Sequence, residues 1–152
     1  MKNTDMIAQE ISVSTDPSLL DRELIYGFIV GSYWAKGIPR DTLDKAIKNS
    51  LCFGAYKNKG NTQVGFARVV TDYSTFAYLC DVFVVESERG QGVSRLLLSA
   101  IMAHEDLQGL RRFCLGTLDG QELYKKFGFV VIKSPENWME IKKPNIYIEN
   151  KY

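Results

Sequence analysis

Residues 76–101 read FAYLCDVFVVESERGQGVSRLLLSAI, and this stretch decides the fold. Its first ten residues are apolar except at Asp81, which is typical of a strand buried on both faces in the middle of a sheet. Apolar residues then recur every three or four positions over 93–104 and predict a helix with one buried stripe. The connecting loop holds Gly90 and Gly92. The stretch therefore predicts a central strand joined by a glycine loop to the N-terminus of a helix.

This loop has the features of an anion site. A helix N-terminus presents unpaired N–H groups and about half a positive charge, and glycines let a phosphate oxygen approach the backbone closely. Arg89 adds a permanent charge, while Gln91 and Ser94 add side-chain donors. Ser94 is also placed to cap the helix. The alternative is a strand-to-helix turn that uses glycine only for its backbone freedom.

Two known phosphate motifs do not fit the loop. A P-loop requires a lysine, and none occurs between Lys59 and Lys125. A dinucleotide fingerprint requires a third glycine, where this chain has Arg95. The remaining interpretation is that the loop holds the pyrophosphate of another cofactor.

Around this unit the sequence alternates strand and helix patterns without internal repeats or a long linker. Asp16 is the expected N-cap of the first helix, with Pro17 at its first position and Tyr33 near its end. The predicted elements in order are a strand at 6–13, helices at 16–33 and after Pro39, a hairpin at 50–57 and 63–71, and the central strand with its helix. A strand at 111–117, a helix at 120–127 and a strand at 129–133 follow. The tail segments WMEI (138–141) and NIYIENK (145–151) can each add a short strand.

Length and composition fit one soluble globular domain spanning residues 1–152. The chain is 45% hydrophobic and has 19 basic and 18 acidic residues, so its formal charge of +1 gives no support for a nucleic acid partner. The N-terminus lacks the pattern of a secretory leader, and no apolar run approaches the roughly 20 residues that span a bilayer. We therefore expect a cytoplasmic protein without a membrane partner.

The three cysteines and single histidine make a metal site improbable on composition, because no C-x-x-C pair occurs. Cys52, Cys80 and Cys114 each lie in an apolar segment. Such thiols usually act as small hydrophobic residues in a reduced core. The alternative for Cys80 is a nucleophile that accepts the acyl group. We expect no metal.

The loop resembles the first signature of the GNAT superfamily of N-acyltransferases, [RQ]-x-x-G-x-[GA], here Arg89-Gly90-Gln91-Gly92-Val93-Ser94. Residues 123–129, LYKKFGF, are similar to the second signature, in which a tyrosine on a short helix faces the cofactor sulfur. The order of elements agrees over nearly the whole chain. Ser94 departs from the usual Gly or Ala, which puts the tightness of cofactor binding in question.

The resemblance implies an α+β fold with a mixed, mostly antiparallel sheet of six to seven strands and about four helices. In this fold two central strands, ending here at Val85 and Thr117, splay apart to admit the pantetheine arm of acetyl-CoA. The central strand usually carries a bulge that frees backbone groups, and an N–H near Val84 would stabilise the oxyanion. The implied cofactor-binding residues are Phe83, Val84, Arg89, Gly90, Gln91, Gly92, Val93 and Ser94.

Acetyl transfer to an amine requires a proton acceptor for the amine and a donor for the departing thiolate. The resemblance implies that Tyr124 is the donor, and the alternative is a half-buried aromatic side chain without a catalytic role. The base stays open. Asp81 is one candidate, although strand alternation puts it on the face opposite Cys80 and favours a paired structural carboxylate equally. Asp119 fits a helix N-cap better, His104 fits a helix C-terminal contact, and a water chain is a further alternative.

The implied function is direct transfer of the acetyl group of acetyl-CoA to a primary amine of a small molecule or peptide, by a monomer or homodimer. The segment GSYWAKGIPR supplies Tyr33, Trp34 and Arg40 near the acceptor side. These aromatic residues either form an acceptor pocket or anchor the helices to the sheet. The alternative function is a non-catalytic acyl-CoA sensor or interaction module, which would keep the loop but need no acid.

Overall fold

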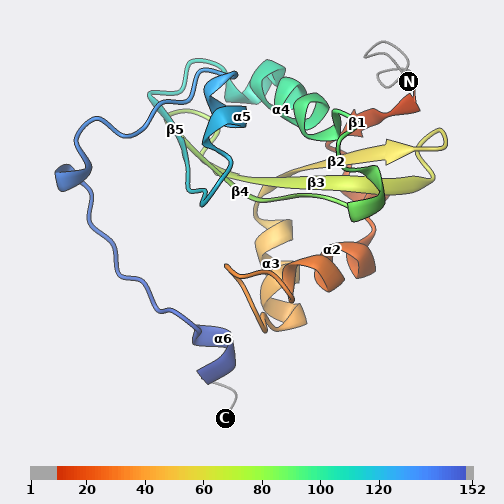
Figure 1. Cartoon of the computed structure of the whole chain (residues 1–152), viewed down its shortest axis with the longest axis horizontal. Helices are drawn as coiled ribbons and strands as arrows, with labels where there is room; N and C mark the ends of the chain where they lie inside the picture. Colours follow the sequence, from red (N-terminus) through yellow and green to blue (C-terminus); the bar gives the residue numbers. More distant parts are fainter. Residues whose placement is uncertain (1–9, 150–152) are drawn as a thin grey trace.

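The computed structural model of the protein describes residues 10–149, which form a five-stranded sheet in the order β1-β2-β3-β4-β5 (Figure 1). All neighbouring strands are antiparallel except β4 and β5, which are parallel. The strands are β1 (Ser12–Ser14), β2 (Leu51–Lys57), β3 (Thr62–Thr71), β4 (Phe76–Val84) and β5 (Arg112–Leu115). The expected mixed α+β fold is confirmed, with fewer strands than the six to seven anticipated.

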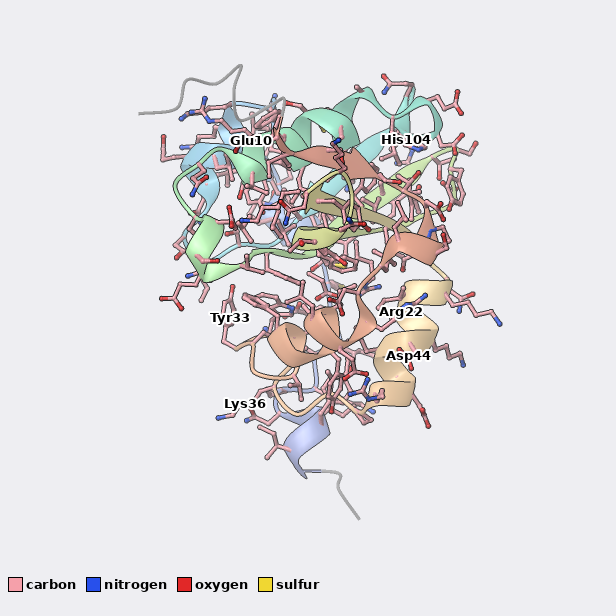
Figure 2. All side chains as sticks on the ribbon, turned by 90° about the vertical axis from the view of Figure 1, so that its right-hand side faces the viewer. Glu10, Arg22, Tyr33, Lys36, Asp44 and His104 are labelled. Atoms are coloured by element: carbon pink, nitrogen blue, oxygen red, sulfur yellow. The ribbon has the colours of Figure 1, made fainter. Side chains whose placement is uncertain are left out.

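Helices cover both faces of the sheet. On one face lie α4 (Val93–Ala103) and α5 (Gln121–Lys125), and on the other lie α2 (Arg22–Ile29) and α3 (Arg40–Lys48). In the side view, His104 at the end of α4 lies above the sheet, while Arg22 and Asp44 of the other helix pair lie below it (Figure 2).

Each helix layer buries its own apolar cluster against the sheet. Leu97, Leu98 and Ile101 of α4 pack on one face, and Ile25 of α2 with Leu43 of α3 pack on the other. The strands contribute side chains to both clusters, because successive side chains of a strand point to opposite faces of the sheet. The central position of β4 between these two layers explains its nearly continuous apolar sequence.

The first helix begins later and ends sooner than the sequence pattern predicts. Asp16 caps only a short 3-10 turn at Pro17–Leu19, where its side chain accepts from the Ser18 N–H. The α-helix starts after Asp21, whose carboxylate accepts from the Leu24 N–H at 3.1 Å. A second capping carboxylate therefore divides the segment in two. Tyr33 lies beyond the end of this helix.

The predicted strand at 129–133 and both tail strands are wrong. The sheet of the described residues ends at β5, and the predicted segments do not pair with the outer edge of that strand. Residues 130–145 run away from the sheet as an extended arm that includes a 3-10 turn at Pro135–Asn137, and the segment at 145–151 contains the short helix α6 (Ile146–Glu149) instead (Figure 1). The strand predicted at 6–13 is observed as β1 from Ser12, and residues 6–9 of it lie outside the described part.

A bulge interrupts β4 in its middle. Phe66 pairs with Phe83 and Arg68 pairs with Cys80, so two steps on β3 correspond to three on β4. The additional residue is accommodated at Asp81, whose backbone is left-handed with φ of +54°. A bulge at this strand is what the family resemblance implied. It also breaks the simple alternation on which the position of Asp81 was predicted.

Candidate functional site

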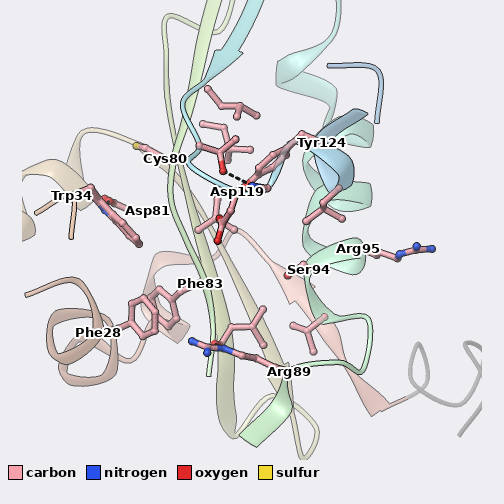
Figure 3. Close-up of a pocket in the computed structure, with 18 of the residues that line it drawn as sticks. Phe28, Trp34, Cys80, Asp81, Phe83, Arg89, Ser94, Arg95, Asp119 and Tyr124 are labelled. Atoms are coloured by element: carbon pink, nitrogen blue, oxygen red, sulfur yellow. Dashed lines mark hydrogen bonds between the residues drawn. The ribbon is translucent and has the colours of Figure 1, made fainter. Parts of the chain in front are cut away.

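A cleft opens where β4 and β5 part. Their pairing runs from Phe76 and Arg112 to Leu79 and Leu115, after which β4 continues to Val84 paired only with β3. The cleft has a volume of about 600 Å³ and is lined by residues 78–84 of β4, by the segment after β5, by α5 and by the glycine loop (Figure 3). It is the wedge that the splayed pair of strands was expected to form.

The glycine loop meets the cleft at the N-terminus of α4. Gly90 and Gly92 are left-handed, with φ of +78° and +85°, and a Cβ at either position would meet no atom within 4 Å. Glycine is therefore required at these two positions because their backbone is left-handed, and not because a side chain would clash with a neighbouring atom. Gly92 is the N-cap and no side chain caps the helix, so the expected capping role of Ser94, which lies inside the first turn, is wrong.

Basic side chains accompany the free N–H groups of this first turn. Arg89 donates from Nε to the Val84 carbonyl at 3.2 Å and lines the cleft. Arg95 lines it too, although in the sequence this residue stood out only as the position of an absent third glycine. Its position three residues after Gly92, in the first helical turn, was the signal that could have found it. Gln91 is not among the residues that line the cleft.

The loop is anchored from behind by a partly buried ion pair. Glu88 is buried and its carboxylate binds the Lys57 ammonium of β2. The chain is thus fixed at Glu88 and Arg89 immediately before the two left-handed glycines. This arrangement preorganises the N–H groups at the start of α4, because the loop cannot swing away without breaking both contacts.

Phe83 and Val84 lie along the wall of the cleft next to this loop. The Phe83 ring stacks on Phe28 of α2 with centroids 4.1 Å apart, and it closes the α2 side. The Val84 side chain joins the α4 cluster instead. These two consecutive residues therefore tie both helix layers to the same part of β4 and hold its backbone at the cleft.

Tyr124 lies on α5, on the opposite wall of the cleft (Figure 3). Burial raises the pKa of its phenol above the ordinary value of 10, and the charges of Tyr33 and Asp119 raise it further. The phenol is consequently protonated at neutral pH and is able to donate a proton. Asp119 lines the cleft but does not cap α5, as had been expected, since Gly120 is the N-cap and its N–H bonds to Thr117 Oγ1 at 2.9 Å.

Asp81 is engaged on both of its carboxylate oxygens. Arg68 Nε donates to Oδ2 at 2.8 Å and Trp34 Nε1 donates to Oδ1 at 2.7 Å. Arg68 lies opposite Cys80 in the ladder, so the bulge brings Asp81 to the same face as Cys80 and the predicted opposite face is wrong. These contacts favour the paired structural carboxylate over the general base. They also give Trp34 an anchoring role at the edge of the cleft.

Cys80 lines the cleft but is poorly suited to nucleophilic attack. Burial raises the pKa of its thiol to about 12, although the Arg68 charge acts in the opposite direction. A thiol with this pKa is almost entirely protonated at neutral pH, and the thiolate is the nucleophile.

We therefore expect Cys80→Ala to retain most of the acetyl transfer rate. The measurement is the initial rate of thiol release with a saturating amine, and Cys114→Ala serves as a second thiol variant. A stable acetyl group found on Cys80 by mass spectrometry, after incubation with acetyl-CoA alone, would show that transfer passes through an acyl-enzyme.

Two further residues considered in the sequence have structural contacts away from the cleft. His104 Nδ1 accepts from the Asp106 N–H at 3.1 Å, and its ring lies edge-on to Phe53. Arg40 binds Glu23 with Nη1 to Oε1 at 2.6 Å and lies over the Tyr26 ring. His104 is thus a helix-end contact as expected, and Arg40 does not contribute to an acceptor pocket.

Residues 10–149 contain no cluster of three or more His, Cys, Asp or Glu side chains arranged to hold a metal ion. Within the same residues, no helix combines the length and apolar character needed to cross a membrane.

Comparison with known proteins gives one consistent result. The acetyltransferase (GNAT) domain family matches residues 48–131. A candidate acetyltransferase from Gibberella zeae is 35% identical over 75% of each chain. The crystal structure of a candidate GNAT-family acetyltransferase from Xanthomonas campestris pv. campestris is 49% identical, covers 91% of this chain and 96% of its own, and superposes with a TM-score of 0.88.

More distant structures share the fold. A candidate acetyltransferase from Clostridium acetobutylicum, solved with acetyl-CoA, is 16% identical and covers 87% of this chain and 96% of its own, with a TM-score of 0.63.

Proposed function

Because the chain belongs to the GNAT family of acetyltransferases, we propose that it moves the acetyl group of acetyl-CoA directly to a primary amine of a small molecule or peptide. The observation that carries the proposal is the shared cleft. One cavity joins the splayed end of β4, the uncapped N-terminus of α4 and the Tyr124 phenol. The three free cysteines fit a reducing cytoplasm as the setting of the reaction.

In the proposed complex, the pyrophosphate binds the N–H groups of the first turn of α4, with Arg89 and Arg95 balancing its charge. The pantetheine arm follows the exposed end of β4, which places the thioester beside Val84 and Tyr124. The cofactor supplies an activated acyl group, and the chain supplies position, charge and a proton.

The reaction balances without an acyl-enzyme. The neutral amine attacks the thioester carbonyl, and a backbone N–H near Val84 stabilises the resulting oxyanion. The C–S bond then breaks, the Tyr124 hydroxyl donates its proton to the sulfur, the amine loses a proton to solvent water, and a proton from solvent restores the Tyr124 phenol. Asp81 is not assigned as the base, because both of its oxygens are already bonded.

Gly92→Glu is expected to weaken acetyl-CoA binding by more than about tenfold. The new side chain puts an anion at the phosphate position and imposes a left-handed backbone on a residue that disfavours it. Calorimetric titration with acetyl-CoA measures the effect. Gly60→Glu is the matched control, because Gly60 is also left-handed with open space around it but lies in the β2–β3 turn. If the two variants bound acetyl-CoA with equal affinity, the loop would not be part of the binding site.

The pH dependence of kcat follows from the direction of the Tyr124 pKa shift. An acid works while it is protonated, so activity through Tyr124 falls only as pH rises through a pKa that lies above 10. We expect kcat not to decline between about pH 7 and pH 9.5, where an ordinary amine becomes progressively deprotonated. A fall of kcat with pH in this interval that persists in Tyr124→Phe would result from the titration of another group.

The function is tested by thiol release from acetyl-CoA against a panel of amines, polyamines and peptide N-termini. Turnover with an amine supports the enzyme. Tight binding of acetyl-CoA without turnover on any member of a broad panel supports the alternative, an acyl-CoA sensor of the same fold.

A further inference from the structure

The extended arm between α5 and α6 leaves apolar side chains outside the body of the molecule. Val131, Met139 and Ile141 are 74%, 96% and 95% exposed. Met139 and Ile141 are two residues apart, so in an extended chain they project from the same face. In Figure 1 the arm leaves α5, runs wide of the sheet and returns at α6. The sequence WMEI has the pattern of a strand, and it pairs with no strand of residues 10–149.

The arm is held at both ends. At its start, the Phe129 ring lies edge-on to Phe113 of β5 with centroids 5.4 Å apart. At its end, Tyr147 of α6 packs against the α2/α3 cluster, and its carbonyl lies 3.3 Å from the position that a Cβ on Gly37 would occupy. Midway, Arg112 lies 4.3 Å over the Trp138 ring. These contacts fix the course of the arm while its apolar side chains remain unpacked.

A groove of about 840 Å³ lies between the arm and the outer edge of β5. One wall is residues 112–117, and the other is residues 129–134. Within residues 10–149 the outer edge of β5 pairs with no other strand, so its N–H and C=O groups face this groove. The groove lies between two extended segments, and one further strand would fit between them.

We propose that a second copy of this chain fills the groove with its residues 139–142, while Trp138 keeps its contact with Arg112 of its own chain, and that the exchange is reciprocal. Each copy carries both the open edge and the unpaired strand segment, so a twofold arrangement satisfies both at once. Charge supports the same occupant. The charged residues that line the groove, Arg112, Lys125 and Lys133, are all cationic, and the exchanged segment brings Glu140 between two apolar side chains, with Lys142 only at its end.

The exchanged strand would also complete the wall of the cleft. Leu115, Gly116, Thr117 and Tyr124 line both the groove and the cleft. A strand from the partner would therefore lie directly behind the segment that carries Thr117 and the helix that carries Tyr124. Exchange links dimer formation to the position of the proposed acid.

The oligomeric state in solution tests the proposal without any reference to catalysis. Sedimentation velocity of the full chain is expected to give a dimer, and Met139→Asp with Ile141→Asp is expected to give a monomer. Leu19→Asp is the control, since Leu19 is 45% exposed but lies in the 3-10 turn before α2. A parent that sediments as a monomer at high protein concentration, or a dimer that the arm substitutions leave intact, overturns the proposal.

A crosslinking experiment distinguishes exchange from closure within one chain. Cysteines introduced singly at Met139, Glu140 and Ile141 are oxidised in turn, with the native Cys114 of β5 as the reacting partner. If the arms are exchanged, at least one of the three variants forms a covalent dimer. This dimer no longer forms when Cys114→Ser is added to the same variant. A disulfide formed within a monomer would show that each arm occupies its own groove. Because neither readout uses acetyl-CoA, failure here leaves the proposed acetyl transfer intact.

Discussion

Tyr124→Phe is expected to lower kcat by about 10²- to 10⁴-fold while the dissociation constant of acetyl-CoA hardly changes. The substitution removes one hydroxyl and keeps the ring that lies 6.0 Å from the Phe129 centroid. If the phenol donates its proton only as the C–S bond breaks, its loss affects the transition state and not the bound ground state. Thiol release at saturating acetyl-CoA, with a separate binding titration, measures the two quantities.

Tyr78→Phe is the control for this prediction. Tyr78 also lines the cleft and also has a pKa raised first by burial, but by strand alternation it lies on the face of β4 opposite Ala77 and Leu79, which pack in the α4 cluster. We expect it to keep most of the parent rate. A Tyr124→Phe variant that retains more than about half of the parent kcat would mean that water or another group protonates the sulfur.

Asp81→Ala is expected to lower the free energy of unfolding by about 3–5 kcal/mol. The substitution leaves the Arg68 guanidinium without its carboxylate in a position where the Arg68 side chain is only 18% exposed. It also removes the acceptor of the Trp34 N–H and keeps a left-handed backbone that alanine disfavours. Urea unfolding measures the loss.

Asp81→Asn distinguishes a structural role of Asp81 from a catalytic role. Asparagine tolerates the left-handed backbone and keeps one oxygen for Trp34, so its loss of stability is expected to be smaller than that of Asp81→Ala. With Asp81 as a structural carboxylate, the folded Asp81→Asn protein keeps kcat within a few-fold of the parent. A fall of about a hundredfold without unfolding would instead make Asp81 the general base.

The sequence predicted those features that depend on local pattern. The apolar run of β4, the spacing of the α4 stripe and the two glycines of the loop each have a local physical cause, and the structure places them in one unit. Tyr124 was singled out by resemblance to a family signature, and it lies in the cleft. Arg95 was missed because its residue type was read only against a dinucleotide motif.

Features that depend on pairing between distant segments were not predictable in the same way. The bulge at Asp81 follows from the register between β3 and β4, which no local pattern records, and it reversed the predicted face of that side chain. The segment at 129–133 has a strand pattern, but its local sequence does not record whether the chain pairs with a distant edge, and in the structure it does not pair with β5. The division of the first helix resulted from two capping carboxylates, Asp16 and Asp21, of which the first was taken as the start.

The central claim is that acetyl-CoA occupies the cleft with its pyrophosphate at the N-terminus of α4. A crystal structure of the protein with acetyl-CoA tests it most directly. We predict pyrophosphate oxygens about 3 Å from the N–H groups of the first turn of α4, and the thioester sulfur within hydrogen-bond reach of the Tyr124 hydroxyl. A pyrophosphate bound away from this loop, or a sulfur beyond the reach of Tyr124, would contradict the account.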